Sequence, residues 1–128
     1  MLVPHLHFNG NCKEAIAFYE KAFKTKAESI IYNRDYSPEY DDDKIAHAIM
    51  FIHGQKIFLN DRFGKIDTST DIAVNLIVMW ENESELLAGY EILKENSITI
   101  DPMEVLSYSS LAVQFIDKFG VQWGFMVG

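Results

Sequence analysis

The sequence predicts an α+β protein made of two βαβββ modules, and two observations support this prediction. The order strand, helix, three strands can be traced twice along the 128 residues. Both predicted helices begin with Asn-x-x-Glu, at Asn11 and again 71 positions later at Asn82. Each module alone would leave an apolar sheet face unburied, so we expect a single domain over 1–128, with modules of about 1–66 and 67–128.

In the first module, a helix is predicted from Asn11 to about Lys24, because apolar residues recur there at helical spacing. Asn11 and Glu14 are expected to form a capping box at its start. The pair His53-Gly54 predicts a hairpin turn. Strands are predicted over residues 3–9, 27–33, 45–52 and 55–60, with polar loops over 34–43 and 61–70.

The second module repeats this plan. A helix is predicted after Asn82, with Glu85 at the position that Glu14 holds in the first module. Phe119-Gly120 predicts the last hairpin turn. Strands are predicted over residues 72–80, 98–106, 111–116 and 121–127.

Composition and charge narrow the possible partners and the location. The net charge is −8, from 19 acidic and 11 basic residues, which disfavours nucleic acid and anionic membranes as partners. No apolar run approaches the roughly 20 residues of a membrane helix, and the start of the chain is not patterned as a signal peptide. Cys12 is the single cysteine, so we expect no internal disulfide and a cytoplasmic protein.

Three segments resemble the PhnB-like branch of the vicinal oxygen chelate superfamily, which includes glyoxalases, bleomycin resistance proteins and dioxygenases. They are Phe8 to Tyr19, Ile45 to Ala48 with Gly54 and Leu59-Asn60-Asp61, and Asp117 to Trp123. The resemblance implies the glyoxalase/bleomycin-resistance fold, in which two modules form a curved mixed sheet around a cavity. It also implies a homodimer.

In metal-bearing relatives, four side chains hold a divalent cation that acts as a Lewis acid. The resemblance places these positions at Pro4 or His5, near His47, at Asn75 and near Gly124. His5 and His47 are candidate metal ligands, Asn75 is a poor ligand for zinc or nickel, and Gly124 has no side chain. We therefore expect a largely eroded metal site and no certain cofactor, with a divalent metal ion as the alternative.

Several side chains are candidates for lining a ligand cavity. His5 and His7 lie two apart on a strand and share one face, as do His47 and Phe51. The ordinary alternative for each histidine is a hydrogen-bonded structural residue, and for each methionine a place in the core. The predicted ligand-binding residues are His7, His47, Phe51, Asn75 and Met79.

No catalytic residue is predicted with a named role. Cys12 lies in the first turn of a predicted helix, where a thiolate would be favoured, but a packed small residue is the simpler interpretation. The polar segment Ser107 to Ser110 either borders the cavity or only connects two strands.

The favoured function is small-molecule binding without an assigned reaction. The alternatives are a metal-dependent lyase, isomerase or dioxygenase-like enzyme, which would use His5, His47 and His7, and a dimer whose partner is another protein. Relatives are also described as 3-demethylubiquinone-9 3-methyltransferase-like. Methyl transfer is not expected, because no Gly-rich strand-to-helix turn for a methyl-donor cofactor occurs in this short chain.

Overall fold

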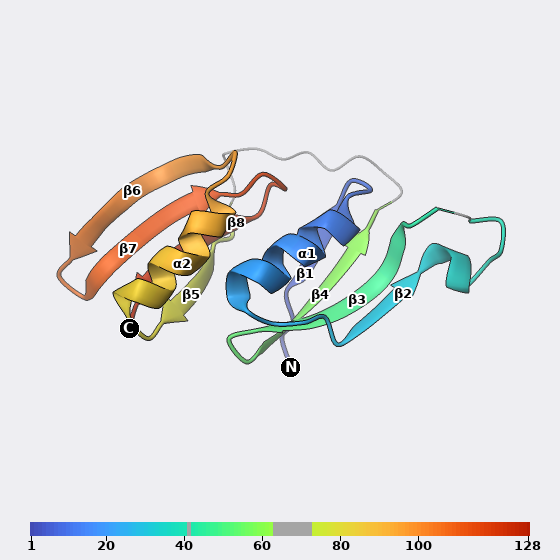
Figure 1. Cartoon of the computed structure of the whole chain (residues 1–128), viewed down its shortest axis with the longest axis horizontal. Coiled ribbons are helices and arrows are strands. Elements are labelled where there is room, and N and C mark those ends of the chain that lie inside the picture. The colour runs from blue at the N-terminus through green and yellow to red at the C-terminus, as the bar shows by residue number, and fades with distance from the viewer. Residues whose placement is uncertain (41, 63–72) are drawn as a thin grey trace. The chain divides into compact units, whose positions relative to one another are not determined.

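The computed structural model describes residues 1–40, 42–62 and 73–128. The chain divides into a first unit, Met1–Asp67, and a second unit, Thr68–Gly128, which are each described by themselves. Figure 1 shows that each unit has one helix lying on one sheet.

The first unit contains a four-stranded sheet in the order β1-β4-β3-β2, where β1 runs parallel to β4 and the other neighbours are antiparallel. Helix α1 packs against β3 and β4. The short 3-10 helix η1 (Asn33–Asp35) begins at the last residue of the predicted strand 27–33 and continues into the predicted loop 34–43. The other elements are β1 (His5–Phe8), α1 (Cys12–Phe23), β2 (Ser29–Tyr32), β3 (Ile45–Ile52) and β4 (Gln55–Asp61).

The start of α1 forms a hydrogen bond with a residue that is distant in the sequence and lies at the end of β4. Asp61, at the end of β4, is buried, and its Oδ1 accepts a hydrogen bond from the Cys12 amide at 2.9 Å. Its Oδ2 accepts from the Ile45 amide, also at 2.9 Å. The predicted capping box at Asn11 is wrong, because Asn11 makes no side-chain cap hydrogen bond. A buried carboxylate supplies the acceptor instead, and the positive end of the helix dipole favours it there.

The second unit repeats the topology of the first. Its sheet has the order β5-β8-β7-β6, with β5 parallel to β8, and α2 packs against β5 and β8. The predicted cap is present in part, because Asn82 Oδ1 accepts from the Glu85 amide. The start of the predicted strand at Ile72 lies outside the described residues. The elements are β5 (Leu76–Trp80), α2 (Glu83–Leu93), β6 (Ile98–Leu106), β7 (Ser109–Ile116) and β8 (Gln122–Val127).

In each unit the core lies between the helix and one face of the sheet. Tyr19 of α1 is fully buried, and its ring lies 6.3 Å from the ring of Phe8 on β1. In the second unit, the ring centroid of Phe125 lies 5.1 Å from the ring centroids of both Trp80 and Phe115. The opposite face of each sheet carries no helix from the described part of its unit and is called the open face below. The period of two along each strand decides which side chains reach it.

The predicted α+β class is confirmed: two four-stranded mixed sheets each pair with one helix. The two helices begin at Cys12 and Glu83, so their starts are 71 residues apart, as the repeated Asn-x-x-Glu pattern predicts. Strands β1 and β2 are shorter than predicted, whereas β3 and β6 match the prediction. The treatment of 1–128 as one domain stays a prediction. In the described part of the chain, no helix is both long enough and apolar enough to cross a membrane.

Candidate functional site

The open face of the first unit gathers three histidines around one aromatic ring. His5 and His7 on β1 have ring centroids 4.3 Å apart. The His47 ring, on β3, lies 4.8 Å from the ring of Phe58 and 6.4 Å from that of His5. Phe58 itself lies between the two histidine strands, because it pairs with His5 on one side and with Ile49 on the other. The predicted ligand-binding residue Phe51 lies on the same face of β3 as His47.

Two of these histidines have defined surroundings. His7 Nδ1 lies 2.6 Å from Asn60 Oδ1, within hydrogen-bonding distance. Partial burial lowers the pKa of His5, and the neighbouring His7, His47 and Arg62 lower it further. His5 is therefore biased toward its neutral form, which can donate and accept hydrogen bonds.

These residues do not complete the metal site that the superfamily implies. A catalytic zinc site uses three good protein ligands and one open position. His5 and His47, the predicted ligands, lie on neighbouring parts of one face. Among residues 1–40, 42–62 and 73–128, however, no group of three or more His, Cys, Asp or Glu is placed to hold a metal ion.

In the second unit, the position where the resemblance places a carboxylate ligand is closed. Gly124 lies on β8 between Ile77 of β5 and Gln114 of β7. A Cβ atom at Gly124 would lie 2.6 Å from Ile77 Cδ1 and 3.0 Å from Asn75 Nδ2. Asn75 Nδ2 also donates to Gln114 Oε1 at 3.2 Å, so an amide pair bridges β5 and β7 over the glycine.

The predicted ligand-binding residues of the second unit share this open face. Met79 on β5 pairs with Met126 on β8, and its side chain is 51% exposed. The Oδ1 atom of Asn75 is buried and has no hydrogen-bond partner among the described residues. Asn75 therefore has an unused acceptor next to the closed Gly124 position.

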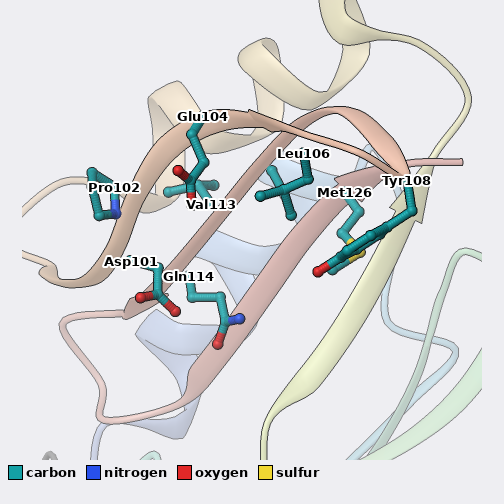
Figure 2. A pocket seen from close by; sticks show the side chains of 9 residues that line it. Asp101, Pro102, Glu104, Leu106, Tyr108, Val113, Gln114 and Met126 are labelled. Carbon is teal, nitrogen blue, oxygen red and sulfur yellow. The ribbon is translucent and has the colours of Figure 1, made fainter.

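A hollow of about 190 Å³ opens on the same face beneath β6 and β7. Figure 2 shows the carboxylates of Asp101 and Glu104 toward one side of it, and Tyr108 with Met126 toward the other. The hollow exists because β6 is irregular. Its pairing with β7 shifts register between Thr99 and Leu106, and such bulges bend a strand.

Sequence reasoning missed Asp101 and Glu104 as site residues. Pro102, in the middle of a predicted strand, was the available signal, because proline in a sheet marks an edge or a bulge. Ser107 and Tyr108 form the turn between β6 and β7, and Tyr108 also borders the hollow.

Cys12 is not an activated thiol. Its side chain is fully buried, and its pKa is raised, first by burial and then by the neighbouring carboxylates of Asp61 and Glu14. The helix dipole would favour a thiolate, but the Asp61 carboxylate already occupies the positive end of α1. The packed small residue is the interpretation that the structure supports.

Over residues 1–126 the chain matches the model of the family described as 3-demethylubiquinone-9 3-methyltransferase, and it belongs to this family.

Three relatives illustrate the similarity. Protein YjdN from Escherichia coli K12 is 26% identical over 137 residues, covering 95% of this chain and 91% of that protein. A solved structure described as a PhnB protein from Bacillus cereus superposes with a TM-score of 0.85 at 23% identity, covering 99% of this chain and 98% of the other. A glyoxylase/bleomycin resistance protein/dioxygenase domain from Frankia sp. EAN1pec gives a TM-score of 0.71 at 16% identity, covering 100% and 96%. The two structures share the fold of this chain.

Proposed function

We propose that this protein binds a small organic molecule on the open faces of its sheets and does so without a catalytic metal ion. The single observation that carries the proposal is the closed position at Gly124, where Ile77 and the amide pair of Asn75 and Gln114 fill the space of a ligand side chain. Within the described part of each unit, the helix contacts the opposite face of its sheet, so α1 and α2 leave the open faces uncovered.

The chemistry of both open faces supports binding of an organic ligand. In the first unit, His7, His47 and Phe51 combine ring surfaces with hydrogen-bonding nitrogens. In the second unit, Met79 supplies an adaptable apolar surface and Asn75 an unpaired acceptor oxygen. Such mixtures of apolar area and a few polar groups are typical of ligand sites.

A screen of chemically diverse metabolites and drugs tests this proposal. Compounds that raise the melting temperature would be followed by isothermal titration, since a ligand that binds the native state stabilises it by mass action. The variant His47→Ala should weaken binding of compounds that contact the first unit, with exposed Glu28→Ala as the matched control. A broad screen that finds no stabilising compound contradicts the proposal.

The alternative is a metal-dependent lyase, isomerase or dioxygenase-like enzyme in which His5 and His47 hold a divalent metal ion. The observation that favours it is the gathering of His5, His7 and His47 on one face. Elemental analysis of protein purified without a chelator or histidine tag decides between the two. Near one equivalent of a transition metal, with a metal-induced rise in melting temperature, would establish the alternative.

We infer further that the chain does not transfer a methyl group, although its family description names a methyltransferase. The common methyl-donor site needs a doubly wound parallel sheet with a Gly-rich turn. Both described sheets are instead mixed, with only β1-β4 and β5-β8 parallel. Measurable binding of S-adenosylmethionine by isothermal titration would contradict this inference.

We propose a cytoplasmic homodimer as the working state. The exposed apolar residues of the edge strand β6, Ile98, Ile100 and Val105, favour association, because unpaired strand edges are normally covered. The free, buried thiol of Cys12 suits a reducing compartment. Light scattering at micromolar concentration should give twice the mass of the chain, and a monomer mass contradicts the dimer.

A further inference from the structure

The hollow beneath β6 and β7 offers negative charge that is not neutralised within its own unit. Asp101 and Glu104 border the hollow, and neither makes an ion pair with another described residue. The only basic residues of the second unit are Lys94 and Lys118. Lys94 pairs with Glu91 at 2.8 Å, and Lys118 with Glu95 at 3.6 Å, so both already have acidic neighbours near α2.

The second unit also contains most of the protein's excess charge. With 9 acidic and 2 basic residues, 68–128 has a net charge of −7, whereas 1–67, with 10 acidic and 9 basic residues, has −1. A field of this sign raises the local concentration of cations and disfavours anions. The hollow therefore lies in the half of the chain that attracts positive charge.

The neutral polar groups of the same open face add acceptors. Asn75 Oδ1 and Gln122 Oε1 are buried and have no hydrogen-bond partner among the described residues. Buried acceptors without a donor are costly, so a native structure normally supplies them with one. Gln122 and Gly124 lie on one face of β8, and Asn75 reaches over Gly124 to Gln114, which borders the hollow. Of these three amides, only Gln114 borders the hollow, where its side-chain oxygen accepts from Asn75 and keeps a second lone pair for a ligand N–H group.

The rest of the hollow is apolar. Leu106, Ala112 and Met126 contribute hydrocarbon and thioether surface, and Tyr108 lies at the side of Met126 (Figure 2). The face of a tyrosine ring attracts an organic cation, and the ring also offers apolar surface to hydrocarbon. A cavity of roughly 150 Å³ accommodates a benzene molecule. About 190 Å³ therefore fits one ring with a short chain.

We propose that the hollow of the second unit binds an organic ammonium ion with a small apolar body, which Asp101 and Glu104 hold by its charge and which Leu106, Tyr108 and Met126 hold by its hydrocarbon. The inference rests on the proposed small-molecule binding and narrows the ligand to amines. The proposed ammonium site consists of residues other than those where the resemblance places metal ligands.

The test compares three compounds of nearly equal shape on the full chain. They are 2-phenylethylamine, the neutral 2-phenylethanol and the anionic phenylacetate. Titrations followed by amide chemical shifts should place the amine at residues 101–114. The amine should bind about threefold to fivefold more tightly than the alcohol, because an ion pair with exposed carboxylates is worth up to about that factor. Its affinity should fall with added salt, and phenylacetate should bind more weakly than the alcohol.

A double variant and a matched control connect the preference to the carboxylates. Asp101→Asn with Glu104→Gln should abolish the preference for the amine. Glu81→Gln with Glu85→Gln removes the same two charges from exposed positions outside the hollow and should retain at least half of the preference. Because all four residues are exposed, these variants are expected to fold, and a thermal melt checks it.

The outcomes also separate this inference from the broader proposal. An amine that binds no more tightly than the alcohol, or that keeps its preference in the Asp101→Asn, Glu104→Gln variant, overturns the ammonium site. If a diverse screen still finds neutral or anionic ligands, the small-molecule proposal stands without it. If no compound of any charge binds, both fail.

Discussion

The two units share one topology but differ in charge and in what their open faces present. In the first unit the sheet order β1-β4-β3-β2 carries three histidines and Phe58, and the net charge is −1. In the second the equivalent order β5-β8-β7-β6 carries Met79, the amide pair over Gly124 and an acidic hollow, and the net charge is −7. The two units therefore share the strands and helices that build their cores, whereas the side chains on their open faces differ.

Each unit also contains a buried aspartate that holds the backbone, but at different places. Asp61 joins the starts of α1 and β3 in the first unit. Asp117 stabilises the turn before β8 in the second, where it accepts from the amides of Phe119 and Val121 and from Trp123 Nε1. The comparison predicts that each unit depends on a different carboxylate.

The largest expected effect is that of Asp117→Ala. The change leaves three donors without their acceptor, one of them the Nε1–H of the buried Trp123. The free energy of unfolding should fall by about 3–4 kcal/mol, since each buried donor left unsatisfied costs about 1–3 kcal/mol and part is regained from water. Urea denaturation measures the loss, and Glu85→Ala should change it by less than about 0.5 kcal/mol.

Asp61→Ala should come second, with a loss of about 2–3 kcal/mol, because two amides lose their acceptor rather than three. The loss should appear as earlier exchange of the amide hydrogens of Cys12 and Ile45. Hydrogen exchange on the variant measures this, with Glu28→Ala as the control. An Asp61→Ala loss larger than that of Asp117→Ala would reverse the comparison.

Gly124→Ala should have a smaller effect, a loss of about 1 kcal/mol. The new methyl group meets Ile77 Cδ1 and Asn75 Nδ2, and forcing extra volume into a filled site costs about 1–3 kcal/mol. The end of the half-exposed Ile77 side chain can move aside, which keeps the cost low. Adding Ile77→Ala should recover most of it, and the double-mutant cycle gives the coupling. Independent effects of the two changes would show that Ile77 does not close the position.

The smallest effect concerns the histidine face. Because the folded state lowers the pKa of His5, the unfolded chain binds more protons between that lowered value and the ordinary 6.5. The contribution of His5 to stability is therefore full above pH 6.5 and decreases as the pH falls through this window. His5→Gln should flatten the slope of unfolding free energy against pH from 5 to 8. A steeper decline toward low pH in the variant would contradict the assignment.

Local sequence patterns predicted the elements well because their causes are local. The Asn-x-x-Glu starts, the hairpin residues His53-Gly54 and the alternation in β3 depend on neighbours within a few positions. The acceptor that caps the start of α1 is not predictable from such local patterns, because Asp61 is 49 residues away from Cys12 in the sequence. Asn11 therefore looked sufficient by itself.

The candidate site was predicted less completely for the same reason. Placing His5 beside His47 and Phe58 requires knowing that β1 pairs with β4 and β4 with β3. The hollow depends on register shifts along β6, and Pro102 indicates an irregular strand without giving its register. Asp101 and Glu104 therefore looked like ordinary charges on a strand.

The arrangement around Gly124 also sets an order on sequence change. A carboxylate introduced at this position meets Ile77 and the Asn75 amide before it can face a cation. A shorter residue in place of Ile77 would therefore lower the cost of a later substitution at Gly124. A lineage that reversed this order would pass through an intermediate that is less stable by about 1 kcal/mol, so one order of the two substitutions is favoured over the other.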